Sequence, residues 1–247
     1  MSGPVAVNGV VLLAAPAGEY DKRLILLTKE RGKITAFARG ARKSTSPLLA
    51  AANPFVFATF YVYEGRTAYN LYQAEIHHHF TDLAREIPGV YYGFYFLEFA
   101  DYYGREGVDG SSMVNLLFVA LKSLGNPQIS NELVRYVFEL KLMVQNGEYP
   151  QVFECASCRA KENLNYFSIS RGGVLCEDCG GKAKDAKKIS SSLLYTLQYI
   201  VSAPLKNLYT FTVTREVLAE LAALMGDYVK EYTDKRFKSL EILEMMC

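Results

Sequence analysis

The sequence of 247 residues has no run that approaches 18 consecutive apolar residues, so we expect no helix that crosses a membrane. It also lacks internal repeats, low-complexity tracts and a large excess of one charge, since 27 basic residues stand against 26 acidic ones. The common nucleotide-binding, metalloprotease and serine-hydrolase motifs are absent. We therefore expect a cytoplasmic protein that is not an enzyme. Its 50% hydrophobic content excludes a disordered chain.

The near-zero net charge is an average over unlike segments. Residues 1–50 carry eight basic and three acidic side chains, a net charge of +5. Residues 80–150 carry five basic and nine acidic side chains, a net charge of −4. Positive charge confined to one segment indicates a polyanionic partner for that segment alone.

The first eighty residues have the composition of a small β-barrel. Apolar, β-branched and aromatic runs between Gly, Pro and Asn turns predict five strands: Val5–Leu13, Lys22–Thr28, Lys33–Arg39, Phe55–Tyr63 and Thr67–Ile76. The apolar stretch Val10–Ala17 lacks the positively charged segment that precedes a signal-peptide core, so we interpret it as strand. Five strands with a longer connection after the third are typical of an OB-type barrel. A barrel without a ligand would show the same pattern.

After the barrel, apolar residues recur at helical spacing. The predicted helices are Tyr91–Tyr103, Ser112–Leu124, Asn131–Asn146, Ser190–Ser202 and Arg215–Tyr232. We therefore predict a multidomain α+β protein with an N-terminal β-barrel (OB-fold) and a C-terminal α-helical domain that contains an inserted four-cysteine zinc module. The predicted boundaries are 1–80 for the barrel, 81–150 and 183–247 for the helical domain, and 151–182 for the insertion.

Four of the five cysteines form two C-x-x-C pairs, Cys155/Cys158 and Cys176/Cys179, with seventeen residues between them. Two such turns place four thiolates around a tetrahedral Zn²⁺ ion. Two disulfides, four unrelated thiols or a rubredoxin-like iron site are the alternatives. Because four cysteines leave no open coordination position, we expect Zn²⁺ to have a structural role. We interpret Cys247 as a free thiol.

Side chains alternate along the predicted strand Lys33–Arg39, so its cations and its aromatic ring share one face. That combination suits single-stranded nucleic acid, because cations contact phosphates and aromatic rings stack on unpaired bases. Two further cations follow the turn at Gly40. The candidate nucleic-acid-binding residues are therefore Lys33, Phe37, Arg39, Arg42 and Lys43. An ordinary solvated strand face is the alternative.

Two other clusters are weaker signals. The run His77–His79 lies at a predicted strand end, where consecutive side chains point to opposite faces, so we expect solvated histidines and not a metal site. We expect the lysines that follow the zinc module to belong to a solvated linker; they are Lys182, Lys184, Lys187 and Lys188.

In the order and spacing of several short segments, the chain resembles the RecO family. These segments are Gly18–Asp21, Leu24–Thr28 followed by Gly32-Lys33, Arg39–Ser44, the four-cysteine module and Phe237–Leu240. The resemblance implies an N-terminal OB-fold, a helical domain and, as in many members, a zinc-binding insertion. It places Lys33, Arg39, Arg42 and Lys43 in the basic OB-fold region of the family.

The resemblance also implies a function in DNA repair and homologous recombination, in the RecF pathway, without catalytic turnover. Such a protein binds single- and double-stranded DNA and anneals complementary strands. With RecR it assists RecA, indirectly, in replacing SSB on DNA, and it is cytoplasmic and nucleoid-associated. The competing hypotheses are a zinc-ribbon factor that binds RNA or acts in transcription, and a zinc enzyme that acts on nucleic acid.

Overall fold

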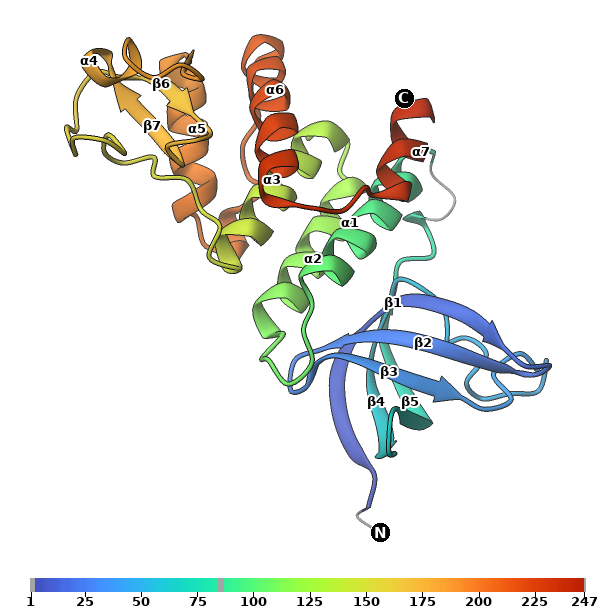
Figure 1. Ribbon diagram of the computed structural model, residues 1–247. Coiled ribbons are helices and arrows are strands. Elements are labelled where there is room, and N and C mark those ends of the chain that lie inside the picture. The colour runs from blue at the N-terminus through green and yellow to red at the C-terminus, as the bar shows by residue number, and fades with distance from the viewer. Residues whose placement is uncertain (1–2, 84–86, 247) are drawn as a thin grey trace. The chain divides into compact units, whose positions relative to one another are not determined.

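The computed structural model describes residues 3–83 and 87–246, which form two compact units (Figure 1). Unit 1 comprises Met1–Gly125 and Phe237–Cys247, and unit 2 comprises Asn126–Arg236. Cys247, expected to be a free thiol, lies outside the described residues. Within the described ranges, no helix is long and apolar enough to cross a membrane.

Unit 1 begins with a closed five-stranded barrel, which confirms the predicted OB-type fold. Its strands pair in the order β1-β2-β3-β5-β4. All neighbouring pairs are antiparallel except β3 with β5, which run parallel. The strands are β1 Val5–Ala17, β2 Asp21–Thr28, β3 Gly32–Ala38, β4 Val56–Glu64 and β5 Tyr69–His79.

The barrel interior is filled by apolar side chains from every strand. On β3 the burial alternates as predicted, because Ile34, Ala36 and Ala38 are buried while Lys33 and Phe37 are half-buried on the outer side. This alternation follows from the two-residue period of a strand, one face of which lines the core.

Three helices complete unit 1: α1 Gly89–Tyr103, α2 Ser111–Leu124 and α7 Lys238–Met246. The loop between α1 and α2 is bonded to the turn between β2 and β3, where the Lys33 N–H donates to Arg105 O at 3.0 Å. Gly32 in this turn has φ 63°, and a Cβ there would lie 2.1 Å from Arg105 O. Only glycine combines that backbone conformation with so close an approach.

The helix α7 was not predicted from the sequence, because nine residues are too few to establish a helical period. The start of α7 packs against α1 and is hydrogen-bonded to it. Phe237 contacts the rings of Tyr95 and Phe99, with ring centroids 5.8 and 5.1 Å apart. Glu98 of α1 accepts a hydrogen bond from the Ser239 N–H at 2.9 Å, which caps the first turn of α7.

Unit 2 contains the helices α3 Asn131–Gln145, α5 Ser191–Ser202 and α6 Arg215–Tyr232. Each begins at a hydroxyl N-cap that accepts a hydrogen bond from a backbone N–H of the first turn: Ser130, Ser190 and Thr214. The Lys141 ammonium donates to three carbonyl oxygens at the end of α5, those of Ile200, Val201 and Ala203. A buried cation here compensates the partial negative charge of the helix C-terminus.

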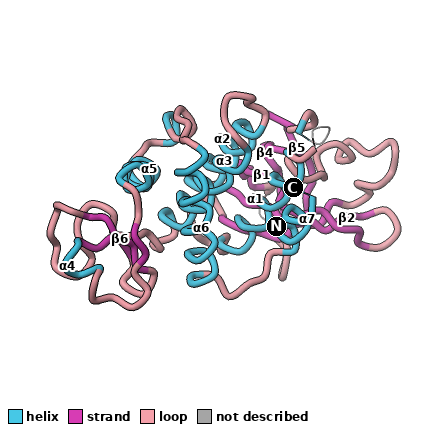
Figure 2. The backbone as a smooth tube through the Cα atoms, turned by 90° about the horizontal axis from the view of Figure 1, so that it is seen from above, coloured by secondary structure: helices cyan, strands magenta, loops and turns pink. Residues whose placement is uncertain are grey.

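The inserted module, which we name the ribbon, lies between α3 and α5 in the sequence. It contains β6 Leu164–Ser168, β7 Gly173–Cys176, the single helical turn α4 Glu177–Gly180 and the short β8 Lys187–Lys188. The three strands pair in the order β7-β6-β8, and β6 and β7 form an antiparallel hairpin. Figure 2 shows these strands (magenta) beside α5.

Candidate metal centre and nucleic-acid interface

The ribbon brings the four predicted ligand cysteines together. The Sγ atoms of Cys155, Cys158, Cys176 and Cys179 all lie within 4.8 Å of one another. Cys158 Sγ and Cys176 Sγ are 3.6 Å apart, whereas a disulfide requires about 2 Å. Four sulfurs at about 2.3 Å from a central metal ion would be about 3.8 Å apart at the corners of a tetrahedron. The cluster therefore has dimensions that fit a metal ion and not two disulfides.

Hydrogen bonds within the cluster shift the pKa values of its thiols in opposite directions. Burial opposes ionisation of Cys155, but hydrogen bonds from the N–H groups of Cys176, Cys158 and Ser157 outweigh it and lower its pKa to about 6. Hydrogen bonds with the Cys176 and Cys158 thiols raise the pKa of Cys179 to about 12. Four thiolates this close repel one another, so the cluster is fully deprotonated only when a cation is bound.

The turns that carry the cysteines depend on unusual backbone positions. Arg159, directly after the first pair, has φ 63°, and its N–H donates to Cys155 O at 2.9 Å. Gly180, directly after the second pair, packs against the ring of Tyr166, and a Cβ at this glycine would lie 2.4 Å from two ring atoms. Only glycine leaves room for the tyrosine.

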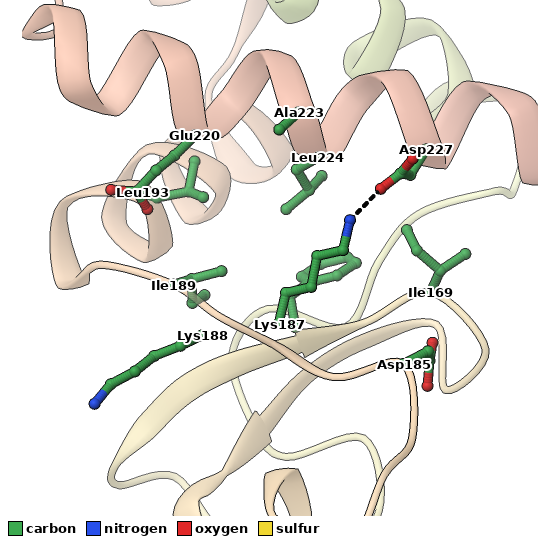
Figure 3. Close-up of a pocket in the computed structure, with 11 residues that line it drawn as sticks. Ile169, Asp185, Lys187, Lys188, Ile189, Leu193, Glu220, Ala223, Leu224 and Asp227 are labelled. Atoms are coloured by element: carbon green, nitrogen blue, oxygen red, sulfur yellow. Dashed lines mark hydrogen bonds and ion pairs between the residues drawn. The ribbon is translucent and has the colours of Figure 1, made fainter.

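The ribbon packs on α5 and α6 through apolar side chains. A cavity of about 140 Å³ lies at this contact, and its lining includes Phe167, Ile189, Leu193 and Leu224 (Figure 3 labels the last three). Beside it the Lys187 ammonium forms an ion pair with Asp227 of α6 at 2.6 Å. Both partners are exposed, so this pair adds little stability in comparison with the apolar contact.

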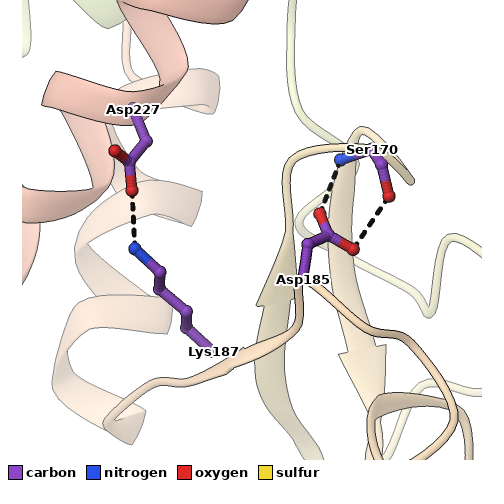
Figure 4. Close-up of polar contacts among 4 residues, drawn as sticks. All are labelled: Ser170, Asp185, Lys187 and Asp227. Atoms are coloured by element: carbon purple, nitrogen blue, oxygen red, sulfur yellow. Dashed lines mark hydrogen bonds and ion pairs between the residues drawn. The ribbon is translucent and has the colours of Figure 1, made fainter.

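A second polar contact ties the chain after the second cysteine pair to the hairpin. The carboxylate of Asp185 accepts hydrogen bonds from the Ser170 N–H at 2.9 Å and from the Ser168 and Ser170 hydroxyls at 2.8 Å (Figure 4 shows those from Ser170). The Ser170 N–H above all, together with the two hydroxyls, lowers the pKa of Asp185 to about 2. The ribbon lysines of the predicted linker are exposed, apart from the pairing of Lys187.

The candidate nucleic-acid-binding residues lie on the outer surface of the barrel in unit 1. Because β3 and β5 are parallel, the end of β3 lies beside the start of β5, and the turns there share one end of the barrel with the β1–β2 turn. We name this region the basic end; its cations are Lys22, Arg23, Arg39, Arg42, Lys43 and Arg66. Three acidic side chains accompany them: Glu19, Asp21 and Glu64.

Two of the predicted residues differ in their surroundings from the exposed cations of the basic end. Lys33 is at the start of β3, where its ammonium donates to Asp101 O at 2.6 Å and pairs with the Asp101 carboxylate at 3.2 Å. Phe37 is half-buried in the outer face of the sheet, paired with Arg23 on β2 and Asn70 on β5. The positive charge of Lys33 is therefore already compensated within unit 1.

Two others stabilise the turns that carry them. The Arg42 guanidinium donates to Gly18 O at 3.2 Å and Glu19 O at 3.0 Å. The Lys43 ammonium lies 5.0 Å from the centre of the Tyr20 ring. Both side chains are exposed, so their charges remain accessible while their positions are restricted.

Arg39 is exposed and lines a groove of about 530 Å³ together with Tyr63 and Tyr72. These two tyrosines were not among the candidates from the sequence. Their signal was present in the aromatic-rich fourth and fifth strands, but the spacing alone does not show that β5 brings Tyr72 beside Arg39. Arg23 and Arg66 were also not among the candidates, because residue spacing does not show which turns and strand ends lie at the same end of the barrel.

The three histidines do not converge on one point, as expected. The ring of His77 shares a hydrogen bond with the Thr59 hydroxyl at 2.7 Å, and the ring of His78 packs edge-on against Phe80 and Phe118. Burial first, and then the charge of His78, lower the pKa of His79. Among the described residues, the four-cysteine cluster is the only group of metal-binding side chains found close together.

Comparisons with known proteins cover nearly the whole chain. Residues 1–80 match the family model described as Recombination protein O N terminal, and residues 85–241 match the one described as Recombination protein O C terminal. DNA repair protein RecO of Alkaliphilus metalliredigens is 31% identical over 240 residues, which cover 96% of this chain and 98% of that protein.

Two more relatives are similar to the same extent. DNA repair protein RecO of Caldanaerobacter subterraneus is 29% identical over 94% of both chains. The protein of the same name from Acetivibrio thermocellus is 28% identical over 97% of this chain and 96% of its own. A closed N-terminal barrel, a helical region with a four-cysteine cluster and these matches in both halves lead to one assignment: the chain belongs to the RecO family.

Proposed function

We propose that this protein is a mediator of DNA repair and recombination that binds DNA without chemical turnover. The observation that carries the proposal is an OB-type barrel whose outer surface combines cations with aromatic rings, in a chain that matches the RecO family over both halves. OB barrels bind single strands by tracking the backbone with positive charge and stacking bases on aromatic side chains.

The proposed mechanism is electrostatic. Arg39, Arg42 and Lys43 hold the phosphates of a strand at the basic end, with Arg23 and Arg66 beside them. Phosphate contacts position a strand without reading its sequence, so most of its bases stay available for pairing. Neutralising the charge of one strand lowers its repulsion for a complementary strand, and this promotes annealing of the two.

We infer that the metal of the ribbon is Zn²⁺, held by Cys155, Cys158, Cys176 and Cys179. Zn²⁺ accepts four thiolates in tetrahedral geometry, and such closed sites supply folding free energy to small modules. Four sulfur ligands leave no position for water or substrate, which supports a structural and not a catalytic role.

Its proposed partners are single- and double-stranded DNA, RecR and the single-strand-binding protein SSB. Together with RecR, the protein would assist RecA in replacing SSB. The relatives named DNA repair protein RecO support this assignment at the level of the repair process. The individual partners are proposed from the family resemblance.

The decisive experiment is annealing of complementary DNA strands coated with SSB, with and without this protein. We expect the protein to accelerate formation of the duplex, because it neutralises phosphates while leaving the bases free. Loss of the acceleration at high salt is expected as well, since each phosphate contact releases counterions.

Two outcomes would contradict the proposal. One is an annealing rate that the protein does not change at any salt concentration. The other is a strong preference for structured RNA over single-stranded DNA, which would favour a zinc-ribbon factor that binds RNA. Metal analysis tests the Zn²⁺ site separately: we expect one Zn²⁺ per chain, and iron or a substoichiometric amount would refute it.

A further inference from the structure

Two exposed tyrosines form a small aromatic platform on the outer face of the barrel. Tyr72 on β5 is 62% exposed and Tyr63 on β4 is 39% exposed. Their ring centroids are 5.8 Å apart, with an angle of 72° between the ring planes. In this edge-to-face arrangement the edge of one ring meets one face of the other, and the remaining ring faces are not covered within the pair.

The backbone of β5 directs Tyr72 out of the barrel. Tyr61 pairs with Gln73 and Val62 pairs with Leu71, so Tyr72 is the extra residue of a β-bulge. Leu71 points into the barrel core, whereas Tyr72 and Gln73 are both exposed. A bulge of this kind alters the direction of a side chain, and bulges recur beside functional sites.

The platform forms one wall of the groove that Arg39 also lines. The segment Ser46–Leu48 lines the same groove, and its Leu48 is buried in the barrel core. This segment is held in a turn by the Leu48 N–H, which donates to the Ser46 hydroxyl at 3.2 Å. The groove therefore combines exposed aromatic rings, an exposed guanidinium and a segment that is anchored in the barrel core.

We propose that this groove binds one unpaired nucleobase on the ring of Tyr72, while Arg39 contacts the adjoining phosphate. The ring stacks on a base because every base has a π-face, and this makes the contact tolerant of sequence. In a duplex each base is already stacked between its neighbours, so the platform favours single strands. The proposal deepens the proposed DNA-binding function and rests on it.

A cation beside the platform is what selects nucleic acid as the occupant. An aromatic pair alone is equally suited to a protein partner. Here Arg39 lies on the same groove, and the other cations of the basic end continue from it along the turns. A strand that follows these charges passes the platform with its bases exposed.

The test measures the affinity of Tyr72→Ala for a fluorescent oligothymidylate and for a duplex of the same length. We expect the affinity for the single strand to fall at least about fivefold, and the affinity for the duplex to change less than about twofold. Tyr72→Phe keeps the ring and should bind as the unmodified protein does. Tyr195→Ala, which removes a 70% exposed tyrosine from α5, is the matched control.

The salt dependence of DNA affinity distinguishes base stacking on Tyr72 from the phosphate contact of Arg39. Tyr72→Ala should leave the slope of log affinity against log salt unchanged, whereas Arg39→Ala should reduce it by about 0.7. If Tyr72→Ala loses affinity equally for the single strand and the duplex, or loses none, the proposal that a base stacks on Tyr72 is wrong. If the unmodified protein binds neither DNA form, the proposed function itself fails, so the two failures are distinguishable.

Discussion

At the scale of single residues, the cations of the barrel differ in how much of their charge remains available. Lys33 is paired with Asp101, whereas Arg42 and Lys43 are exposed and Arg39 lines an open groove. Burial, and then the nearby charge of Arg42, lower the pKa of Lys22, whose ammonium donates to Ala52 O at 2.8 Å. We therefore choose Arg39, Arg42 and Lys43, three of the exposed cations of the basic end, for the test.

We expect the triple substitution of Arg39, Arg42 and Lys43 by Ala to weaken DNA binding for all sequences alike. Three lost phosphate contacts on a single strand should flatten the salt slope by about 2. A salt titration of oligonucleotide binding measures this change. The matched control removes the same charge from the ribbon, by Ala at Lys182, Lys184 and Lys188. If both triple variants flatten the salt slope equally, the placement of the DNA-binding surface on the barrel is wrong.

Asp185 provides a second test at this scale. Its folded-state pKa of about 2 lies below the usual value of 3.8, because the Ser170 N–H and two hydroxyls bind the carboxylate. The carboxylate therefore stabilises the ribbon above about pH 4, and this contribution disappears as the pH falls through about 2. An NMR titration of the side-chain carboxyl carbon should give this low pKa, and a midpoint near 4 would show that these hydrogen bonds are absent in solution.

At the scale of structural elements, the ribbon depends on its cysteines more than on its strands. The strands β6 and β7 have five and four residues, and β8 has two. Such short strands do not fold alone, because their buried area does not offset the conformational entropy lost. The four thiols lie where the hairpin and the two turns meet, so one ion can hold all of these pieces.

Removal of the metal should unfold the ribbon and leave the barrel folded. With a strong chelator, or in the variant Cys176→Ser, we expect amide hydrogen exchange to become fast in residues 151–188 and to stay slow in the barrel strands. Binding of oligothymidylate should persist, because the proposed DNA contacts lie in unit 1. If the ribbon amides stay protected from hydrogen exchange in the metal-free protein, the metal ion has no structural role. If DNA binding is lost, the ribbon contributes to that binding.

The elements themselves were largely predictable. The five barrel strands and five of the helices follow from periods of 2 and 3.6 residues and from turn residues, which act within a few positions of the chain. The short α7 was not, since its position depends on contacts with α1, more than a hundred residues earlier.

At the scale of the whole molecule, the C-terminal segment completes unit 1. The chain leaves this unit after Gly125 and returns to it at Phe237, which is 4% exposed and packs among the aromatic rings of α1. The segment Phe237–Leu240, first noticed through its family resemblance, thus has a physical role in covering α1. The predicted barrel at 1–80 is only one part of the compact unit.

We expect Phe237→Ala to lower the stability of unit 1 by about 3 kcal/mol or more, because it removes a buried ring and leaves a cavity. The exposed Ile242 of the same helix provides the control, and Ile242→Ala should cost less than about 1 kcal/mol. Hydrogen exchange of the α1 amides under mild denaturant measures both effects. Equal exchange in the two variants would mean that α7 does not stabilise α1.

The charge asymmetry, the barrel class and the ligand cysteines could be deduced from residue order alone, because composition, alternation and C-x-x-C spacing are local properties. The side chains and carbonyl groups that contact the cations could not be deduced from residue order. Lys33 pairs with a residue 68 positions away, and Tyr72 meets Arg39 because two strands run parallel and one of them bulges. Such long-range contacts depend on strand register and barrel closure, which are global properties of the folded chain.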